Sequence, residues 1–398
     1  MKNFFKNPCN IYFFFWCLYL LQGTLYPKGA VFAQILLFII LLTSLKHLFQ
    51  IIILYKNDNL IYLKALNILV LMYTIYGIAL FVTDGKMVYG DNIIVPSKNY
   101  LQSYLSSLLP IYSFYYYAKN EYLNIKLIQR WFFVFVGVAI ADYYELQAEE
   151  LQVLMEEGSE REEITNNAGY ALLSLIPCLL VFDKKPILQY IGLGTCFIFI
   201  IMGMKRGAIL IAAIALVIFV WYKLQSTSRN KKILVIIAVG LGLYFLVIFI
   251  QDLFLNSEYF QYRYEKTMNG DASQRGVLHP FFWENFLYRA NAVQMLFGYG
   301  ANGTIKLTFN YAHNDWLEIL TNQGLFGVII FFYYWFAFFY SANFRNLSRE
   351  SRFTLNLIII MYFIKTFFSM SIGNMTIYTN CMIGLTLNDG LKGLTRRE

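Results

Sequence analysis

The sequence predicts an all-α, polytopic membrane protein, a bundle of about twelve transmembrane helices with one large extracytoplasmic loop. Three observations support this fold class. Hydrophobic residues make up 58% of the 398 residues. Only 14% are charged, against about 25% in soluble globular proteins. Long apolar runs recur along the whole chain, and the longest polar interval among them is residues 252–324.

A transmembrane helix needs about 20 mostly apolar residues, and the chain offers about twelve such segments. No linker rich in Pro, Gly or Ser separates them, so residues 1–398 are expected to form a single integral membrane domain. The first segment follows Lys2 and Lys6 without a small-residue cleavage site, so we expect an uncleaved span rather than a signal peptide. The expected segments are 9–26, 29–50, 60–83, 99–118, 128–146, 168–182, 186–204, 206–222, 233–251, 325–340, 353–370 and 374–390.

The basic residues predict the orientation of these segments. Most of them fall in one set of alternate connections, together with both termini. By the positive-inside rule this side is cytoplasmic. The opposite side then holds an acidic loop at 148–167, expected to be solvated, and the large loop at 252–324. The cytoplasmic set is Lys2, Lys6, Lys46, Lys56, Lys64, Lys119, Lys126, Arg130, Lys184, Lys185, Lys223, Arg229, Lys231, Lys232, Arg345, Arg349, Arg352, Lys392, Arg396 and Arg397.

The net charge of +8 does not indicate a nucleic-acid-binding protein. Its basic residues sit in short clusters between apolar runs, which is typical of cytoplasmic loops. The five cysteines have neither CxxC nor zinc spacing and fall in or beside apolar runs, so they are expected to be small core or lipid-facing residues.

A glycine motif in the large loop, Gly298-Tyr-Gly300-Ala-Asn-Gly303, matches the pattern GxGxxG. The dinucleotide fingerprint needs a preceding strand and a βαβ unit, and neither is predicted between two membrane spans. We therefore interpret these glycines as sites of tight turns or close backbone approach.

His313 is one of three histidines and precedes Asn314-Asp315-Trp316-Leu317-Glu318. One interpretation is structural: His-Asn-Asp starts a short helix, with Asn314 or Asp315 as its cap. The other is functional, because an imidazole near neutral pKa is a general base that takes a proton from a sugar hydroxyl. Glu318 is five residues further on, so a direct pair with His313 is not implied by helix geometry.

Two arginines are candidates for binding a diphosphate outside the membrane. Arg206 follows Lys205 at the predicted outer face, where the positive-inside rule disfavours basic residues, although it can also be an interfacial side chain. Arg275 lies in Asp271-Ala-Ser-Gln-Arg275-Gly276, which reads as a loop, and Arg289 is a second choice in the same interval. A guanidinium fork binds phosphate oxygens bidentately. There is neither a DxD-like pair nor a cluster with metal spacing, so no metal and no cofactor are expected.

Three stretches of the chain together resemble one known family. GYGANG…YAHNDWLEILTNQGLFG is similar to the signature of the O-antigen ligase and O-antigen polymerase family, GMKRGAIL to its arginine at the start of a span, and SQRG to its Ser-x-Arg. The similarity is most specific over 270–330, weaker over 165–225 and only topological elsewhere.

This resemblance implies a GT-C-like helix bundle in the bacterial cytoplasmic (inner) membrane and a metal-independent, inverting glycosyltransferase. The donor would be an undecaprenyl-diphosphate-linked glycan at the outer face, and a glycan acceptor, membrane lipids and other polysaccharide-assembly proteins are candidate partners. His313 would activate the acceptor, and Arg206 and Arg275 would bind the diphosphate. Supporting roles would fall to Asn314, Asp315, Glu318 and Arg289, although Arg275 lies further from Gly298 than the family pattern leads us to expect.

Within this family we favour a polymerase of surface-polysaccharide repeat units (O-antigen, capsule or exopolysaccharide), with a ligase to lipid A core or another acceptor as the alternative. The competing class is a transporter or flippase of the same lipid-linked sugar. Coupled transporters place ionisable residues near the membrane midplane, whereas the predicted spans here are nearly free of charge. Lys365 is the main exception, toward the outer end of its span.

Overall fold

The computed structural model describes residues 6–54, 60–83, 88–89, 92–93, 97–156, 166–268, 275–308 and 310–392. These residues are almost entirely helical, and each of the twelve predicted segments contains helix. One small hairpin pairs Val88 with Ile93 and Tyr89 with Asn92. The elements are α1(Pro8–Leu20), α2(Val31–Leu54), α3(Ile61–Thr83), β1(Val88–Tyr89), β2(Asn92–Ile93), α4(Ser97–Leu108), α5(Pro110–Lys119), α6(Ile125–Glu156), α7(Gly169–Leu173), η1(Ile176–Phe182), α8(Pro186–Met202), α9(Arg206–Ser226), α10(Arg229–Asn256), α11(Glu258–Met268), α12(Arg275–Glu284), η2(Asn285–Arg289), α13(Ala292–Phe297), α14(Gly303–Thr308), α15(Asp315–Asn343), α16(Arg349–Phe368), η3(Ile372–Asn374) and α17(Ile377–Leu387).

Six of these helices are long and apolar enough to cross a membrane, namely α2, α3, α9, the part of α10 from Val235, α15 and α16. The expected number of about twelve spans is thus supported for half of the segments. The segment 99–118 is divided into α4 and α5 by Pro110, which lacks an N–H and starts the second helix. α1, α7 with η1, α8 and α17 are apolar but shorter.

The polar interval 252–324 is not an open loop in its described parts. It contains the end of α10, then α11, α12, η2, α13, α14 and the first turns of α15. The acidic loop expected at 148–167 also begins later, because α6 continues to Glu156. Near this end of α6, Lys28 pairs with Glu145 (3.0 Å) and Glu149 (2.5 Å). The residues 157–165 lie outside the described part.

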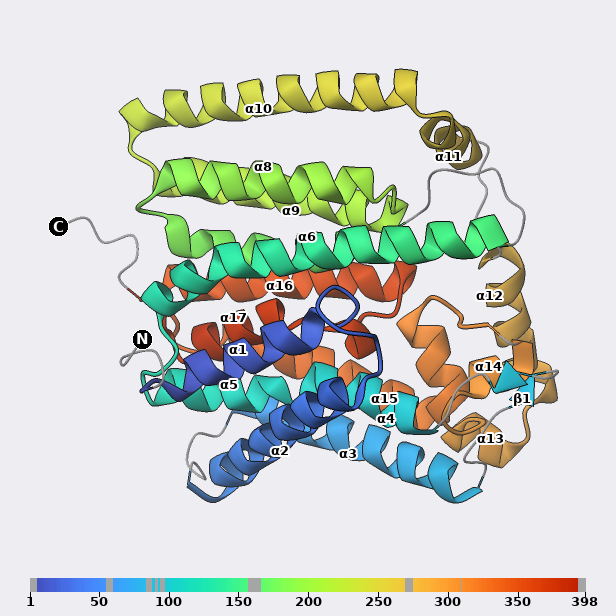
Figure 1. Ribbon diagram of the computed structural model, residues 1–398. Helices are drawn as coiled ribbons and strands as arrows, with labels where there is room; N and C mark the ends of the chain where they lie inside the picture. Colours follow the sequence, from blue (N-terminus) through green and yellow to red (C-terminus); the bar gives the residue numbers. More distant parts are fainter. Residues whose placement is uncertain are drawn as a thin grey trace.

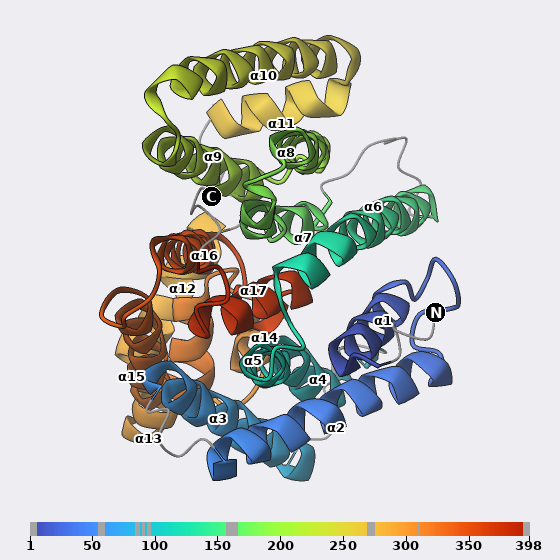
Figure 2. The same cartoon turned by 90° about the vertical axis from the view of Figure 1, so that its left-hand side faces the viewer.

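The helices run side by side, and α12, α13 and α14 lie at the opposite end of the bundle from the start of α1 (Figure 1). α8, α9, α10 and α11 form a group beside the other helices (Figure 2). α5 and α17 lie near the centre, where Gly384 lets them approach closely: a Cβ at this position would be 2.6 Å from the carbonyl carbon of Phe114. Small residues allow such contact between membrane helices, which gain no hydrophobic driving force from lipid.

Most of the buried apolar residues form one large cluster with many aromatic rings. Tyr62 stacks obliquely on Phe338 at 4.5 Å between ring centroids, and Tyr73 lies parallel to Tyr104 at 3.8 Å. All five cysteines are buried and free, as their apolar surroundings predict.

Candidate functional site

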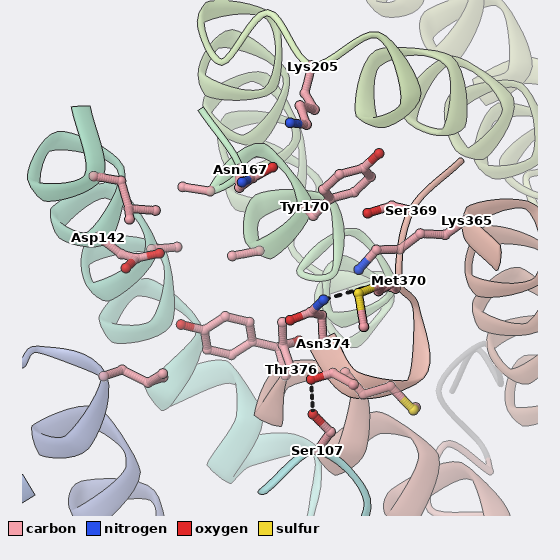
Figure 3. Close-up of a pocket in the computed structure, with 18 of the residues that line it drawn as sticks. Ser107, Asp142, Asn167, Tyr170, Lys205, Lys365, Ser369, Met370, Asn374 and Thr376 are labelled. Atoms are coloured by element: carbon pink, nitrogen blue, oxygen red, sulfur yellow. Dashed lines mark hydrogen bonds between the residues drawn. The ribbon is translucent and has the colours of Figure 1, made fainter. Parts of the chain in front are cut away.

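Three residues from distant parts of the sequence meet at one cavity. Arg206, Arg275 and His313 all line a cavity of about 640 Å³. Its walls come from α1, α4, α6, α7, α9, α12, α16, α17 and the segment before α15, and Figure 3 shows part of this lining. Sequence reasoning selected these three residues separately, and the fold brings them together.

Arg206 is held at the start of α9 by a tight turn. α8 ends at Gly203, and Met204 has a positive φ of 49°, so the chain reverses within two residues. A hydrogen bond from another segment stabilises this turn, because the Asn166 backbone N–H donates to the Gly203 carbonyl (2.9 Å). Lys205 occupies the N-cap position and Arg206 the first turn. The positive end of the helix dipole therefore adds to these two side-chain charges.

Arg275 begins a helix, α12, and its side chain is half-buried. The expectation that Arg275 and Gly276 lie in a loop is therefore wrong, while Ser273 and Gln274 of the SQRG stretch lie outside the described residues. Arg289, the second choice, is exposed at the end of η2 and does not line the cavity. The structure thus separates the two arginines that the sequence left as alternatives.

Both backbone polar groups of Ala312, the residue before His313, make hydrogen bonds to side chains. The Ala312 N–H donates to the Glu318 carboxylate (2.5 Å), and the Ala312 carbonyl accepts from Nε2 of His279 (3.0 Å). A carbonyl can only accept, so His279 carries its proton on Nε2. His313 itself has a positive φ of 52°, a conformation that an L-residue adopts only when its surroundings enforce it.

Asn314, rather than Asp315, caps the helix that follows His313. Its side-chain oxygen accepts from the N–H groups of Trp316 (2.9 Å) and Leu317 (3.2 Å). The buried Asp315 carboxylate instead accepts from the backbone N–H of Ser371 (2.8 Å) and ties α15 to the turn after α16. The structural interpretation of this motif therefore holds for Asn314 and leaves the His313 side chain unexplained.

Glu318 does not pair with His313 but supports the backbone around it. Besides Ala312, its buried carboxylate accepts from Thr304 Oγ1 (2.7 Å) and Asn322 Nδ2 (3.3 Å). Asn322 in turn accepts from the Thr304 N–H (3.0 Å), at the start of α14. Removal of a buried carboxylate that accepts several hydrogen bonds destabilises the fold, because each donor would lose its partner.

The two glycines of the Gly-Tyr-Gly stretch permit a close backbone contact. The N–H of Tyr299 donates to the Thr321 carbonyl (2.8 Å), and that of Gly300 to the Asn322 carbonyl (3.0 Å). Gly298 has a φ of 74°, and a Cβ there would be 2.4 Å from the Asn322 backbone. This contact agrees with the interpretation of the glycines as sites of close approach rather than of nucleotide binding.

The His313 imidazole is partly exposed and has no hydrogen-bond partner among the described residues. Its pKa is lowered from the ordinary value of 6.5, first by partial burial and then by the positive charges of Arg275, Lys205 and His279. At neutral pH the ring is therefore mainly uncharged, and a neutral imidazole can accept a proton.

The cavity is positively charged. Four basic side chains line it, Lys205, Arg206, Arg275 and Lys365, against the single carboxylate of Asp142. Such a lining favours an anionic ligand. Asn167 and Tyr170 also line the cavity (Figure 3), but their local sequence carries no signal that distinguishes them from other polar and aromatic residues near membrane spans. Among the described residues, no three His, Cys, Asp or Glu side chains come together as a metal site.

A comparison with protein families shows what part of the chain is similar to. Residues 191–332 match the O-antigen ligase family (Wzy_C). The resemblance read from the sequence motifs is thereby confirmed, and the matched region contains Arg206, Arg275 and His313. The match supports a membrane enzyme of the O-antigen ligase and polymerase type, acting on a lipid-linked glycan and an acceptor. No curated protein matches the chain.

Proposed function

We propose that this protein is an inverting glycosyltransferase that polymerises undecaprenyl-diphosphate-linked repeat units of a surface polysaccharide at the outer face of the cytoplasmic membrane. One observation carries the proposal: a neutral imidazole and two guanidinium groups from three distant segments line the same cavity. A base beside a positively charged anion site is what transfer from a diphosphate donor to a hydroxyl requires.

In the proposed reaction, His313 takes the proton of the acceptor hydroxyl as its oxygen attacks the anomeric carbon of the donor sugar. The bond between that carbon and the phosphate oxygen breaks, and the lipid diphosphate leaves with the electron pair. Attack from the face opposite the leaving group inverts the anomeric carbon. Arg206 and Arg275 stabilise the charge on the diphosphate, because planar guanidinium groups match pairs of phosphate oxygens.

Glu318 and Asn314 act in this proposal through the backbone. Glu318 holds Ala312, the residue before His313, and Asn314 caps the helix that follows His313. Asp315 anchors the same helix to the turn after α16. Together they fix the position of the imidazole, which must lie within hydrogen-bond reach of the acceptor.

The ligase alternative has the same requirements, because only the acceptor differs. A transporter of the lipid-linked sugar needs a charged binding site but no base, and the proton-accepting state of His313 then has no role. Metal independence stays a prediction, for which the test is transfer in the presence of a chelator.

The experiment that tests the proposal is a gel of products from purified protein incubated with its lipid-linked repeat unit alone. A polymerase yields a ladder of lengthening glycans, which His313→Ala abolishes while the protein keeps its thermal unfolding temperature. Product only after addition of a second acceptor indicates the ligase. A full ladder from the folded His313→Ala variant contradicts the role of His313 as base.

A further inference from the structure

Lys365 is a buried cation at the wall of the cavity that the proposed function does not use. It lies in the last turn of α16, and only 4% of the residue is exposed. Figure 3 shows its ammonium group turned toward the cavity near Tyr170 and Ser369. A lysine is rarely buried to this degree without a partner for its charge.

The neighbours of Lys365 stabilise its charge but leave its ammonium N–H donors without acceptors. Nζ lies 4.7 Å from the centre of the Tyr170 ring and 5.4 Å from that of Tyr362. Aromatic faces attract a cation, yet they are poor substitutes for oxygen lone pairs. Within the described residues, the Lys365 ammonium group makes neither a hydrogen bond nor an ion pair within 4.0 Å.

The acidic residue that acts on the charge of Lys365 is Asp315, whose carboxylate makes hydrogen bonds elsewhere. Its carboxylate accepts from the backbone N–H groups of Ser371 (2.8 Å) and Ile372 (3.4 Å). It therefore supports Lys365 through space without receiving its protons. The ammonium donors are left facing the cavity, where a ligand can supply the missing oxygen.

Tyr170 connects Lys365 to the arginine side of the cavity. A Cβ on Gly207 would be 2.5 Å from the Tyr170 hydroxyl oxygen, so this ring reaches from Lys365 to the first turn of α9. That turn begins with Arg206. Lys365 and the first turn of α9 therefore flank one aromatic ring, and a ligand bound beside this ring lies next to both segments.

We infer that Lys365 binds an anionic phosphate oxygen of the lipid diphosphate, as a third cation beside Arg206 and Arg275. The inference rests on the proposed function. It assigns Lys365 to ligand binding rather than to packing, with the rings of Tyr170 and Tyr362 and the carboxylate of Asp315 keeping the ammonium in place.

The test is binding of undecaprenyl diphosphate to the purified full-length protein, without any glycan. Lys365→Met keeps the length and apolar stem of the side chain and removes its donors. Loss of one charge-assisted hydrogen bond should weaken binding by about ten- to hundred-fold. Lys365→Arg keeps the charge and should retain most of the affinity. Lys64→Met removes a lysine from α3, outside the cavity, and should bind as the wild type does.

Thermal unfolding in the same detergent separates binding from folding. A folded Lys365→Met variant with wild-type affinity overturns the inference, even if the variant is less stable, since a purely structural lysine predicts that result. If Arg206→Lys weakens binding while Lys365→Met does not, the inference about Lys365 is contradicted and the proposed function is not. If the wild type fails to bind undecaprenyl diphosphate, the proposed function is contradicted as well.

Discussion

Partial burial and, after it, nearby positive charges lower the pKa of His313 and keep it uncharged, which is the condition for a base. Arg275, Lys205 and His279 each oppose a further positive charge on the imidazole, in addition to partial burial. The same cations that suit a diphosphate therefore lower the pKa of the base beside them. The cations proposed to bind the anion are thus the groups that help keep His313 able to accept a proton.

This coupling predicts a pH dependence with a definite sign. Protonation inactivates the base, so wild-type transfer should fall as the pH drops through the lowered pKa of His313, below 6.5. Arg275→Gln removes a neighbouring positive charge and should raise that pKa. The fall in the transfer rate on the acid side of the pH profile (the acid limb) should then move to higher pH. Lys205→Gln should act in the same direction with a smaller shift, because Arg275 is the larger contributor.

The measurement is the rate of transfer between pH 5 and 8, with Lys64→Gln as a control for the loss of a distant charge. An acid limb that stays in place in both cavity variants would contradict the assignment of His313 as the titrating group.

At the level of elements, the segment around His313 is held in place by hydrogen bonds and by a small apolar cluster of Phe282, Ala312 and Leu317. Gly298, Tyr299 and Gly300 run against the end of the first part of α15, which stops at Gly324 with a φ of 66°. The span expected from the sequence, 325–340, lies in the longer second part, and the whole helix is long and apolar enough to cross a membrane. The break at Gly324 thus separates the element that carries the site from the element that anchors it.

Gly298→Ala should therefore damage the site. The new Cβ would lie 2.4 Å from backbone atoms of Asn322, and a positive φ alone costs about 1–3 kcal/mol for a residue with a side chain. We expect a lower thermal unfolding temperature and loss of transfer.

The matched control is Gly137→Ala in α6, where a Cβ meets no atom within 4 Å. It should keep wild-type stability or gain slightly, because alanine has the higher helix propensity. Equal behaviour of the two variants would show that close approach at Gly298 is unimportant.

For the whole molecule, the basic residues predict the orientation in the membrane. The structure shows which helices lie at the same end of the bundle. α12 to α14 gather at the end of the bundle away from the start of α1 (Figure 1). If the start of α1 is cytoplasmic, the cavity and these helices face outward, where lipid-linked glycans would reach them.

Cysteine labelling tests this orientation. Val293 in α13 is 66% exposed, and Arg352 is an exposed residue at the start of α16. In a variant without the native cysteines, Val293→Cys should react with a membrane-impermeant maleimide added to intact cells once the outer barrier is opened. Arg352→Cys should react only after the cytoplasmic membrane is permeabilised. The reverse pattern would invert the predicted topology.

The sequence revealed those site residues whose charge is unusual for their surroundings. Arg206 stands out because charged residues are costly beside apolar spans, and His313 stands out because histidine is rare in this chain. The sequence marks Lys365 only as a charge within a predicted span and not as a site residue. Tyr170 could not be found in this way, since aromatic residues are common throughout. The choice between Arg275 and Arg289 also needed the fold, because only three-dimensional packing decides which of two residues in one interval reaches the cavity.

The fold class followed from composition, while the lengths of the elements did not. Hydropathy located the helical segments, but it placed the end of one at 146 where α6 continues to Glu156. The extension includes Glu149, which pairs with Lys28 from the segment between α1 and α2. Long-range contacts of this kind leave no periodic pattern in the sequence.

The central claim is that Arg206, Arg275 and His313 act as one site. The most direct measurement is the rate at which purified protein releases undecaprenyl diphosphate from its lipid-linked repeat unit, compared among four conservative variants. Arg206→Lys and Arg275→Lys should each slow release by about 100-fold, because a point charge does not replace a bidentate fork. His313→Gln should reduce release to background, and Arg289→Lys, outside the cavity, should match the wild type. Full activity of either cavity arginine variant, or a loss at Arg289 as large as at Arg275, would contradict the account.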